Sequence, residues 1–191
     1  IVSASFEGLD GFFAQQAAQD YDADPNTSEG IFVSYQGLGA LPAAGDVVRV
    51  IGTVEESFDK TRLVATESYL ACGQDQVVAT SISLPLPQGL DLESLEGMLV
   101  TSNQLVTLSD VDNYARFGEV VLSSKRLYTP THVEQPGSAA AVALAEENER
   151  NRLILDDDRD GGVTQYPFGT FSPEQPLRVG TQLNGFEGVL D

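Results

Sequence analysis

The sequence predicts a mainly β protein built from two small barrels, the second of which carries one inserted helix. Short runs of β-branched and aromatic residues, too short for helices, recur between glycines, prolines and acidic turns. Several of these runs contain a glycine, which inside a strand marks a bulge or a barrel corner. Only the stretch 139–150 has the alanine-rich composition typical of a helix.

The length and the hydrophobic content are those of a globular protein. The 191 residues are enough for one large or two small domains, and 41% hydrophobic residues permit a proper core. No apolar run approaches the ~20 residues of a membrane helix. Cys72 is the single cysteine, which excludes an internal disulfide framework. Residues 1–6 and 186–191 both resemble strands, so we expect both terminal strands to be truncated from a longer protein.

The chain is strongly acidic. Its formal net charge of −19 comes from 29 Asp and Glu residues against ten Lys and Arg residues. A protein with such a charge repels phosphate backbones at low ionic strength. The charge argues against tight, non-specific DNA binding, so any contact with nucleic acid requires a local patch, a bridging cation or high salt.

The first unit begins with a predicted strand, an acidic loop and a second strand. The aromatic pair Phe12-Phe13 and the run 31–33 are the apolar centres of the two strands, which glycines bound. The loop between them carries the closely spaced oxygen donors that a Ca²⁺ site requires, namely Asp20, Asp22, Asp24, Thr27 and Glu29. The pattern is not that of an EF-hand, because its sixth and twelfth positions are proline and isoleucine instead of glycine and glutamate.

Three interpretations of this acidic loop are open. It is a solvated hairpin tip, a structural Ca²⁺ site or a catalytic metal site. Three carboxylates within a few residues repel one another by about 1 kcal/mol per close pair, and a divalent cation would remove that cost. A second acidic loop at 156–162 is open to two of these interpretations, a solvated turn and a cation site.

The rest of the first unit consists of bent strands. The stretch 45–57 alternates apolar and polar residues around Gly52, where we expect a corner at which a neighbouring backbone comes close. A turn at 58–62 and a strand from Leu63 follow. Similar glycine-containing phrases at 95–100 and 186–191 indicate repeated barrel construction and two similar units.

A linker separates the two predicted units. Two prolines and a glycine make 83–90 an extended connector between a first barrel, 1–82, and a second barrel, 91–191. The second unit has predicted strands at 96–101, 118–123 and 152–155 and a turn at 129–131. Its helix, at about 139–150, has Ser138 as the N-cap, and its small apolar face predicts that it covers one end of the barrel.

Two small barrels with a helix inserted in the second fit the oligonucleotide/oligosaccharide-binding (OB) architecture. OB barrels bind single strands or oligosaccharides with stacking aromatic residues and basic groups. Two segments supply such groups: Tyr114, Arg116 and Phe117 beside a strand, and Lys60 and Arg62 in a basic turn with Phe58. The alternative is that the aromatic residues pack in the barrel and the arginines pair with the surplus carboxylates.

Several phrases of the sequence resemble one family. GFFAQ, GDVVRVIGTVEE, LEGMLVT, NYARFGEVVLSS and LRVGTQLNGFEGVLD occur in this order. They are similar to the region of large secreted bacterial endonucleases of the ExeM type that lies upstream of the endonuclease/exonuclease/phosphatase domain. The similarity covers nearly the whole chain. It implies an extracellular hydrolase that cleaves DNA, an export signal before this region, and a downstream catalytic domain that depends on Mg²⁺.

The chain itself carries no catalytic motif. Its single histidine, His132, has no second histidine to work with, and no P-loop or Gly-x-Ser-x-Gly motif occurs. We therefore expect a non-catalytic region that positions DNA for the downstream nuclease domain of the same chain, without membrane contact and with Ca²⁺ as a structural ion. The alternative is a carbohydrate- or surface-binding module of a secreted protein, and a third interpretation is a structural spacer.

Overall fold

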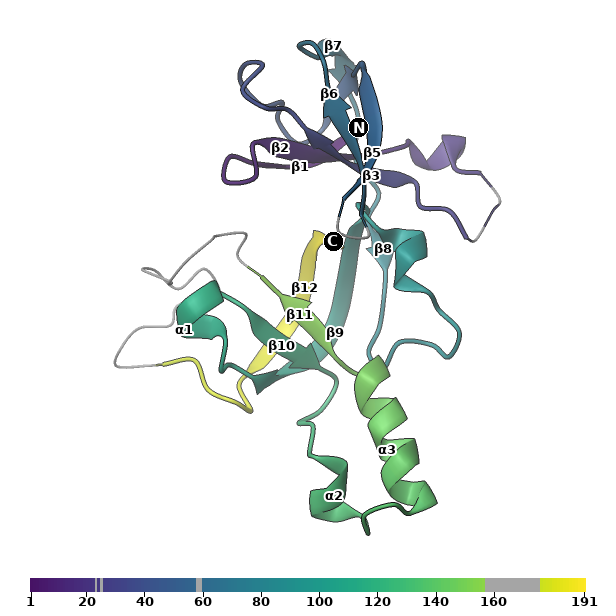
Figure 1. The fold of residues 1–191 in the computed structure, drawn as a ribbon, viewed down its shortest axis with the longest axis vertical. Coiled ribbons are helices and arrows are strands. Elements are labelled where there is room, and N and C mark those ends of the chain that lie inside the picture. Colours follow the sequence, from purple (N-terminus) through teal and green to yellow (C-terminus); the bar gives the residue numbers. More distant parts are fainter. Residues whose placement is uncertain (23, 25, 58–59, 157–175) are drawn as a thin grey trace. The chain divides into compact units, whose positions relative to one another are not determined.

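The computed structural model describes residues 1–22, 24, 26–57, 60–156 and 176–191, and the chain is mainly β, as predicted. The described strands form two five-stranded sheets and one two-stranded sheet, and three α-helices accompany them (Figure 1). Among the described residues neither of the larger sheets closes on itself. None of the described helices is long and apolar enough to cross a membrane.

The chain folds into two compact units that are interleaved in the sequence. Unit 1 comprises Ile1–Ser81, Asp91–Thr101 and Glu187–Asp191, and unit 2 comprises Ile82–Leu90 and Ser102–Phe186. The stretch 83–90, predicted as a linker, belongs to unit 2. Its Leu84 and Leu86 are buried, and the backbone of Leu84 makes two hydrogen bonds with the Gln104 side chain, at 2.9 and 2.8 Å. These contacts explain why the stretch packs against a core instead of forming an extended connector.

The larger sheet of unit 1 has the strand order β1-β2-β3-β6-β5. Its members are β1 (Val2–Phe6), β2 (Gly11–Gln15), β3 (Gly30–Ser34), β5 (Gly52–Ser57) and β6 (Lys60–Ala65). All neighbours are antiparallel except β3 and β6, which run parallel. β2 and β3 form the predicted hairpin around the acidic loop. β4 (Asp46–Arg49) and β7 (Leu70–Gln74) pair with each other in the two-stranded sheet.

Gly52 lies at the bend predicted for the stretch 45–57. The chain leaves the two-stranded sheet after β4 and enters the five-stranded sheet with β5, which begins at Gly52. A Cβ atom at Gly52 would lie 2.3 Å from the carbonyl oxygen of Val64, closer than real Cβ atoms approach. The missing side chain therefore lets two backbones come close at this corner, as expected from the sequence.

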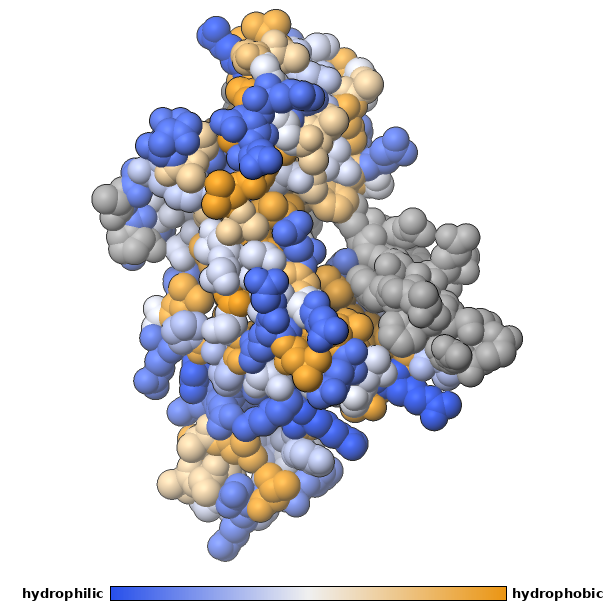
Figure 2. Space-filling view, turned by 180° about the vertical axis from the view of Figure 1, so that it is seen from behind, coloured by the Kyte–Doolittle hydropathy of each residue, from blue (hydrophilic) through white to orange (hydrophobic). Residues whose placement is uncertain are grey.

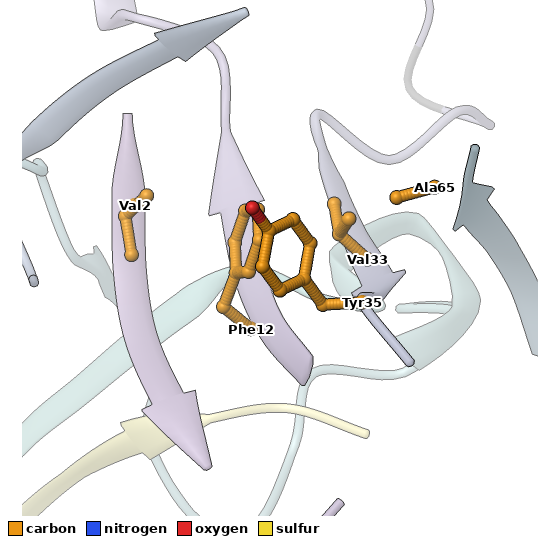
Figure 3. Packing of buried hydrophobic residues seen from close by; sticks show 5 residues of the cluster. All are labelled: Val2, Phe12, Val33, Tyr35 and Ala65. Atoms are coloured by element: carbon orange, nitrogen blue, oxygen red, sulfur yellow. The ribbon is translucent and has the colours of Figure 1, made fainter. Parts of the chain in front are cut away.

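The core of unit 1 lies on one face of its larger sheet. Figure 3 shows the Phe12 ring on β2 facing the Tyr35 ring, with Val2 and Val33 to either side. The centroids of the two rings are 5.9 Å apart in an edge-to-face arrangement. Each fully buried large apolar side chain contributes about 1.5–3 kcal/mol, so this cluster is a main source of stability for unit 1.

The opposite face of the same sheet carries a row of three phenylalanines. Successive strand residues point to opposite faces, so Phe13 lies on the other side of the sheet from Phe12. The centroid of the Phe13 ring is 5.7 Å from that of Phe6 and 4.9 Å from that of Phe32. Phe13 is only 3% exposed, so this row packs the sheet and leaves its central ring out of reach of a ligand.

The other five-stranded sheet has the order β11-β10-β9-β12, with β8 paired to the start of β9. Its members are β8 (Thr80–Ser81), β9 (Leu99–Asp110), β10 (Val120–Ser123), β11 (Leu153–Leu155) and β12 (Gln182–Val189). The division between the units runs through β9 and β12. Within unit 2, the core is built from buried residues of β9 and β10, namely Val106, Leu108, Val120 and Leu122.

α3 (Ala139–Arg150) coincides with the predicted helix. Ser138 Oγ accepts a hydrogen bond from the Ala141 amide at 3.1 Å, as expected of an N-cap. Two short helices precede it and correct the expectation of a single helix: α1 (Tyr114–Phe117) and α2 (Pro130–Val133). α2 replaces the predicted turn at 129–131, because proline suits the first position of a helix.

Candidate nucleic-acid interface

The segment between β9 and β10 contains α1 and is held by local hydrogen bonds. The helix ends at Gly118, which has a φ of 83° and donates its amide to the Tyr114 carbonyl at 3.0 Å. Before the helix, Asp110 Oδ1 accepts a hydrogen bond from the Asp112 amide at 2.8 Å. Across the loop, Asn113 Nδ2 donates to Glu119 Oε2 at 2.8 Å. The side chains of α1 are therefore presented on an ordered turn.

The three predicted nucleic-acid-binding residues of α1 lie in different surroundings. Tyr114 is 8% exposed and belongs to the core of unit 2, whereas Arg116 and Phe117 are exposed. The guanidinium carbon of Arg116 lies 4.7 Å from the centroid of the Phe117 ring, which is a cation–π contact. The expectation that Tyr114 stacks on a base is corrected by its burial. The ring that this segment presents is that of Phe117, which is 37% exposed.

Lys60 and Arg62, the other predicted nucleic-acid-binding residues, lie on β6 and already have acidic partners. Lys60 forms an ion pair with Asp191, and Arg62 Nη2 lies 3.4 Å from Glu55 Oε2 on the neighbouring strand β5. Their positive charge is thus offset within unit 1, as in the interpretation that pairs basic groups with surplus carboxylates. Phe58 of the predicted basic turn lies outside the described residues.

A second exposed cation–π pair, which the sequence analysis did not select, follows β10. The guanidinium carbon of Arg126 lies 5.3 Å from the centroid of the Tyr128 ring, and Tyr128 is 52% exposed. Leu127, between them, is half-buried and donates its amide to Ser109 Oγ at 3.2 Å. Since successive residues of an extended chain point to opposite sides, Arg126 and Tyr128 lie on the same side, and the order Arg-Leu-Tyr was the available signal. The neighbouring Lys125 is bound to a carboxylate of α3 at 2.6 Å.

The predicted metal ligands lie in a loop held together by its own hydrogen bonds. Asp22 Oδ1 accepts the Asp24 amide at 2.8 Å, and Asp24 Oδ1 accepts the backbone and side-chain amides of Asn26 at 3.0 and 2.7 Å. The backbone amide of Asn26, together with its side chain, holds the pKa of Asp24 below its usual value. Glu29 Oε1 accepts the Asp22 amide at 2.8 Å, and Thr27 Oγ1 lies 3.4 Å from both carboxylate oxygens of Asp22.

Hydrogen bonds therefore connect Asp22, Asp24, Thr27 and Glu29 within one loop, mainly from side chain to backbone, and Asp20 ends the short 3₁₀ turn before them (Ala18–Asp20). Within the part of the chain that the structure describes, which leaves out Ala23 and Pro25 of this loop, no three Asp, Glu, His or Cys side chains are grouped to hold a metal ion. A Ca²⁺ ion in this loop stays a prediction. The second acidic loop lies outside the described residues except for Asp156.

The charge of the chain is divided unequally between the two units. Unit 1 contains three basic and 17 acidic residues, a net charge of −14, whereas unit 2 contains seven basic and 12 acidic residues, a net charge of −5. On the face seen in Figure 2, hydrophilic side chains surround separate hydrophobic patches. Unit 2 therefore repels a polyanion less than unit 1 does.

No match was found when the chain was compared with protein-family models, with curated protein sequences and with solved structures. Its function is therefore inferred from its own residues and from the resemblance in its phrases. Among the described residues, the two Arg–aromatic pairs of unit 2 are exposed groups that carry binding chemistry. The acidic loop of unit 1 is the other candidate.

Proposed function

We propose that the chain is a non-catalytic accessory region of a secreted DNA endonuclease, built on two OB-type units, which positions a single DNA strand for a metal-dependent phosphodiesterase domain of the same protein. The observation that carries the proposal is the exposed Arg116–Phe117 pair on the segment between the first and second strands of unit 2. OB folds bind oligonucleotides partly through the loop between their first two strands. Secretion and the nuclease domain come from the family resemblance.

The connectivity of unit 1 supports an OB-type assignment. β1, β2 and β3 form an antiparallel meander, and β3 then pairs in parallel with β6. β4 and β5 together correspond to the fourth strand of an OB fold, and β6 and β7 together to the fifth. β5 pairs with β6 in the five-stranded sheet, and β4 pairs with β7 in the two-stranded sheet. The Gly45 amide donates to the Val2 carbonyl at 2.8 Å, which brings the start of the fourth strand against the first. Such a partly open Greek-key arrangement of five strands is typical of OB folds.

Arg116 and Phe117 combine the two interactions that bind single-stranded DNA. The exposed ring of Phe117 offers a face to a base, and stacking contributes about 1–3 kcal/mol per base. The Arg116 guanidinium is a charge for a phosphate, and among the described residues it makes no ion pair with a carboxylate. The pair also belongs to the less acidic of the two units, so the repulsion that opposes binding is smaller there.

Fluorescence anisotropy with a labelled oligothymidylate tests the proposal. Phe117→Ala should weaken binding by about 1–3 kcal/mol if one base stacks on the ring, and Arg116→Ala should weaken it as well. Arg49→Ala is the matched control, because Arg49 is exposed on β4 of unit 1 and its loss changes the net charge as Arg116→Ala does. Equal affinity of the wild type and Phe117→Ala, or no binding of single-stranded DNA, would overturn the proposal.

A carbohydrate- or surface-binding module is the alternative, because exposed aromatic rings of OB folds also bind oligosaccharides. Binding to polysaccharides that is lost in Phe117→Ala, with no binding to DNA, would favour it. The non-catalytic assignment is tested separately by incubating the chain with plasmid and Mg²⁺. The plasmid should stay intact, and nicking that depends on the protein would contradict the assignment.

A further inference from the structure

The extended segment between β10 and α2 is hydrogen-bonded to the C-terminal end of α3 at both of its ends (Figure 1). At its start, the Ser124 amide donates to Oδ1 of Asn151, the fully buried residue that follows α3, at 2.8 Å. At its end, the Tyr128 carbonyl accepts a hydrogen bond from Asn148 Nδ2 in the last turn of α3 at 2.9 Å. The backbone of this segment is therefore fixed before a ligand arrives, which reduces the entropy that binding costs.

The segment presents a guanidinium and an aromatic ring with the same arrangement as α1 does. The guanidinium carbon lies 5.3 Å from the ring centroid in the Arg126–Tyr128 pair and 4.7 Å in the Arg116–Phe117 pair. Among the described residues, neither ring contacts another aromatic ring and neither arginine forms an ion pair. In each pair a base can stack on the ring face that the guanidinium does not cover, and the guanidinium can bind a phosphate.

The two pairs are close enough for one short DNA strand to reach both. Leu127 is hydrogen-bonded to Ser109 near the end of β9, and the hydrogen-bonded turn that leads into α1 begins directly after β9. The covalent reach of the residues on either side of these contacts allows no more than about 30 Å between the Cα atoms of Phe117 and Tyr128. At a spacing of about 3.4 Å, that of a duplex strand, about nine nucleotides cover this distance, and an extended strand needs fewer. One OB fold binds about 4–16 nucleotides, so this length is within its range.

We propose that Arg126 and Tyr128 form a second stacking subsite of unit 2, which holds another nucleotide of the same DNA strand that Arg116 and Phe117 hold. The second subsite rests on the function proposed for the first pair. A strand that reaches both rings is a bivalent ligand, because its second contact is intramolecular once the first has formed. A strand that is too short reaches only one ring. Unit 2 should therefore bind long strands more tightly than charge alone explains.

The dependence of affinity on strand length tests the proposal. Fluorescence anisotropy is measured with labelled oligothymidylates from about 3 to about 16 nucleotides long. In the wild type the affinity should rise about fivefold or more at the length that reaches the second ring, in addition to a gradual rise with charge. Tyr128→Ala should remove this step and leave the shortest strands within about twofold of the wild type, since one of two sites remains. Tyr128→Phe is the matched control, because it keeps the ring and should bind every length as the wild type does.

The salt dependence of binding gives a second measurement with a different variant. Arg126→Ala should reduce the slope of log affinity against log salt for the long strand by about 0.7, the value for one phosphate contact on a single strand. Arg49→Ala removes the same charge from unit 1 and should leave the slope unchanged.

Three results would overturn the second subsite while Phe117→Ala still weakens binding and the proposed function stands. The first is binding of every length by Tyr128→Ala as by the wild type. The second is equal weakening of every length in Tyr128→Ala, because the two rings would then serve one subsite. The third is an unchanged salt slope in Arg126→Ala, which counts even if Tyr128→Ala does not fold. If the wild type binds no single-stranded DNA at any length, the proposed function and the second subsite are both overturned.

Discussion

Replacing Gly97 with alanine should destabilise unit 1 through two separate effects. Gly97 joins a short 3₁₀ turn (Leu92–Leu95) to β9, has a φ of 72°, and donates its amide to the Leu190 carbonyl at 2.7 Å. A Cβ atom on Gly97 would lie 2.7 Å from the Ile31 nitrogen and 2.9 Å from the Gly30 carbonyl carbon. Both neighbours are backbone atoms of β3, so they cannot rotate away.

The magnitude follows from these two effects. A left-handed conformation costs a residue with a Cβ about 1–2 kcal/mol relative to glycine. Inserting a methyl group against atoms that cannot move costs about a further 1–3 kcal/mol. Gly97→Ala should therefore lower the free energy of unfolding by about 2–5 kcal/mol. Gly37→Ala is the matched control, because Gly37 is also in unit 1, has a φ of 71° and has no atom within 4 Å of the added Cβ.

Urea denaturation followed by far-UV circular dichroism measures both variants. Gly37→Ala should lose only the conformational part, about 1–2 kcal/mol. The difference between the two variants then isolates the close approach of the 91–101 segment to β3. If Gly97→Ala destabilises the protein no more than Gly37→Ala does, the packing of Gly97 against Gly30 and Ile31 is refuted.

Two other predictions concern the carboxylates of unit 1. If the acidic loop binds Ca²⁺, a chelator should lower the melting temperature and added Ca²⁺ restore it, with about 2.7 kcal/mol of stabilisation at a hundredfold excess over Kd. Asp22→Asn should reduce the effect, and a melting curve that is unchanged across millimolar Ca²⁺ would reject the site. Partial burial, and then the charges of Glu93 and Asp191, raise the pKa of Glu96. The folded state thus holds this proton more tightly, so stability falls as pH rises from the ordinary pKa of glutamate to the raised one. Glu96→Gln should remove this decline, which amounts to less than about 1 kcal/mol in the free energy of unfolding. A pH profile of the melting temperature that is the same in the variant and the wild type would contradict the prediction.

Signals carried by neighbouring residues predicted several elements correctly. α3 begins and ends where expected because both its N-cap Ser138 and its alanine-rich composition are local features. The hairpin of β2 and β3 and the corner at Gly52 were also predictable, since turn residues and period-two alternation lie within a few positions of one another. α1 had a local signal as well, because Gly118 is a typical residue to end a helix.

Long-range pairing is what the sequence alone did not reveal. The parallel pair of β3 and β6 joins segments separated by two other strands, and no local pattern encodes this partnership. Residues 91–101 join unit 1 because the backbone of Gly97 fits against that of Gly30, a match between two glycines far apart in the chain. The burial of Tyr114 beside an exposed Phe117 likewise depends on how α1 packs on unit 2.

If unit 2 binds DNA as proposed, the distribution of charge bears on which form of DNA it holds. Exposed charges are largely screened beyond a Debye length of about 8 Å at physiological ionic strength, so contact at α1 is decided by the groups near it. These include Asp110, Asp112 and Glu119 of the same segment, which surround Arg116 in the sequence. One guanidinium among three carboxylates cannot track the phosphates of a duplex, where affinity comes from several neutralised phosphates. Stacking on Phe117 needs no net positive charge, but it requires a base with an accessible face. A single strand, held mainly through its bases, is therefore the form that we expect this segment to bind.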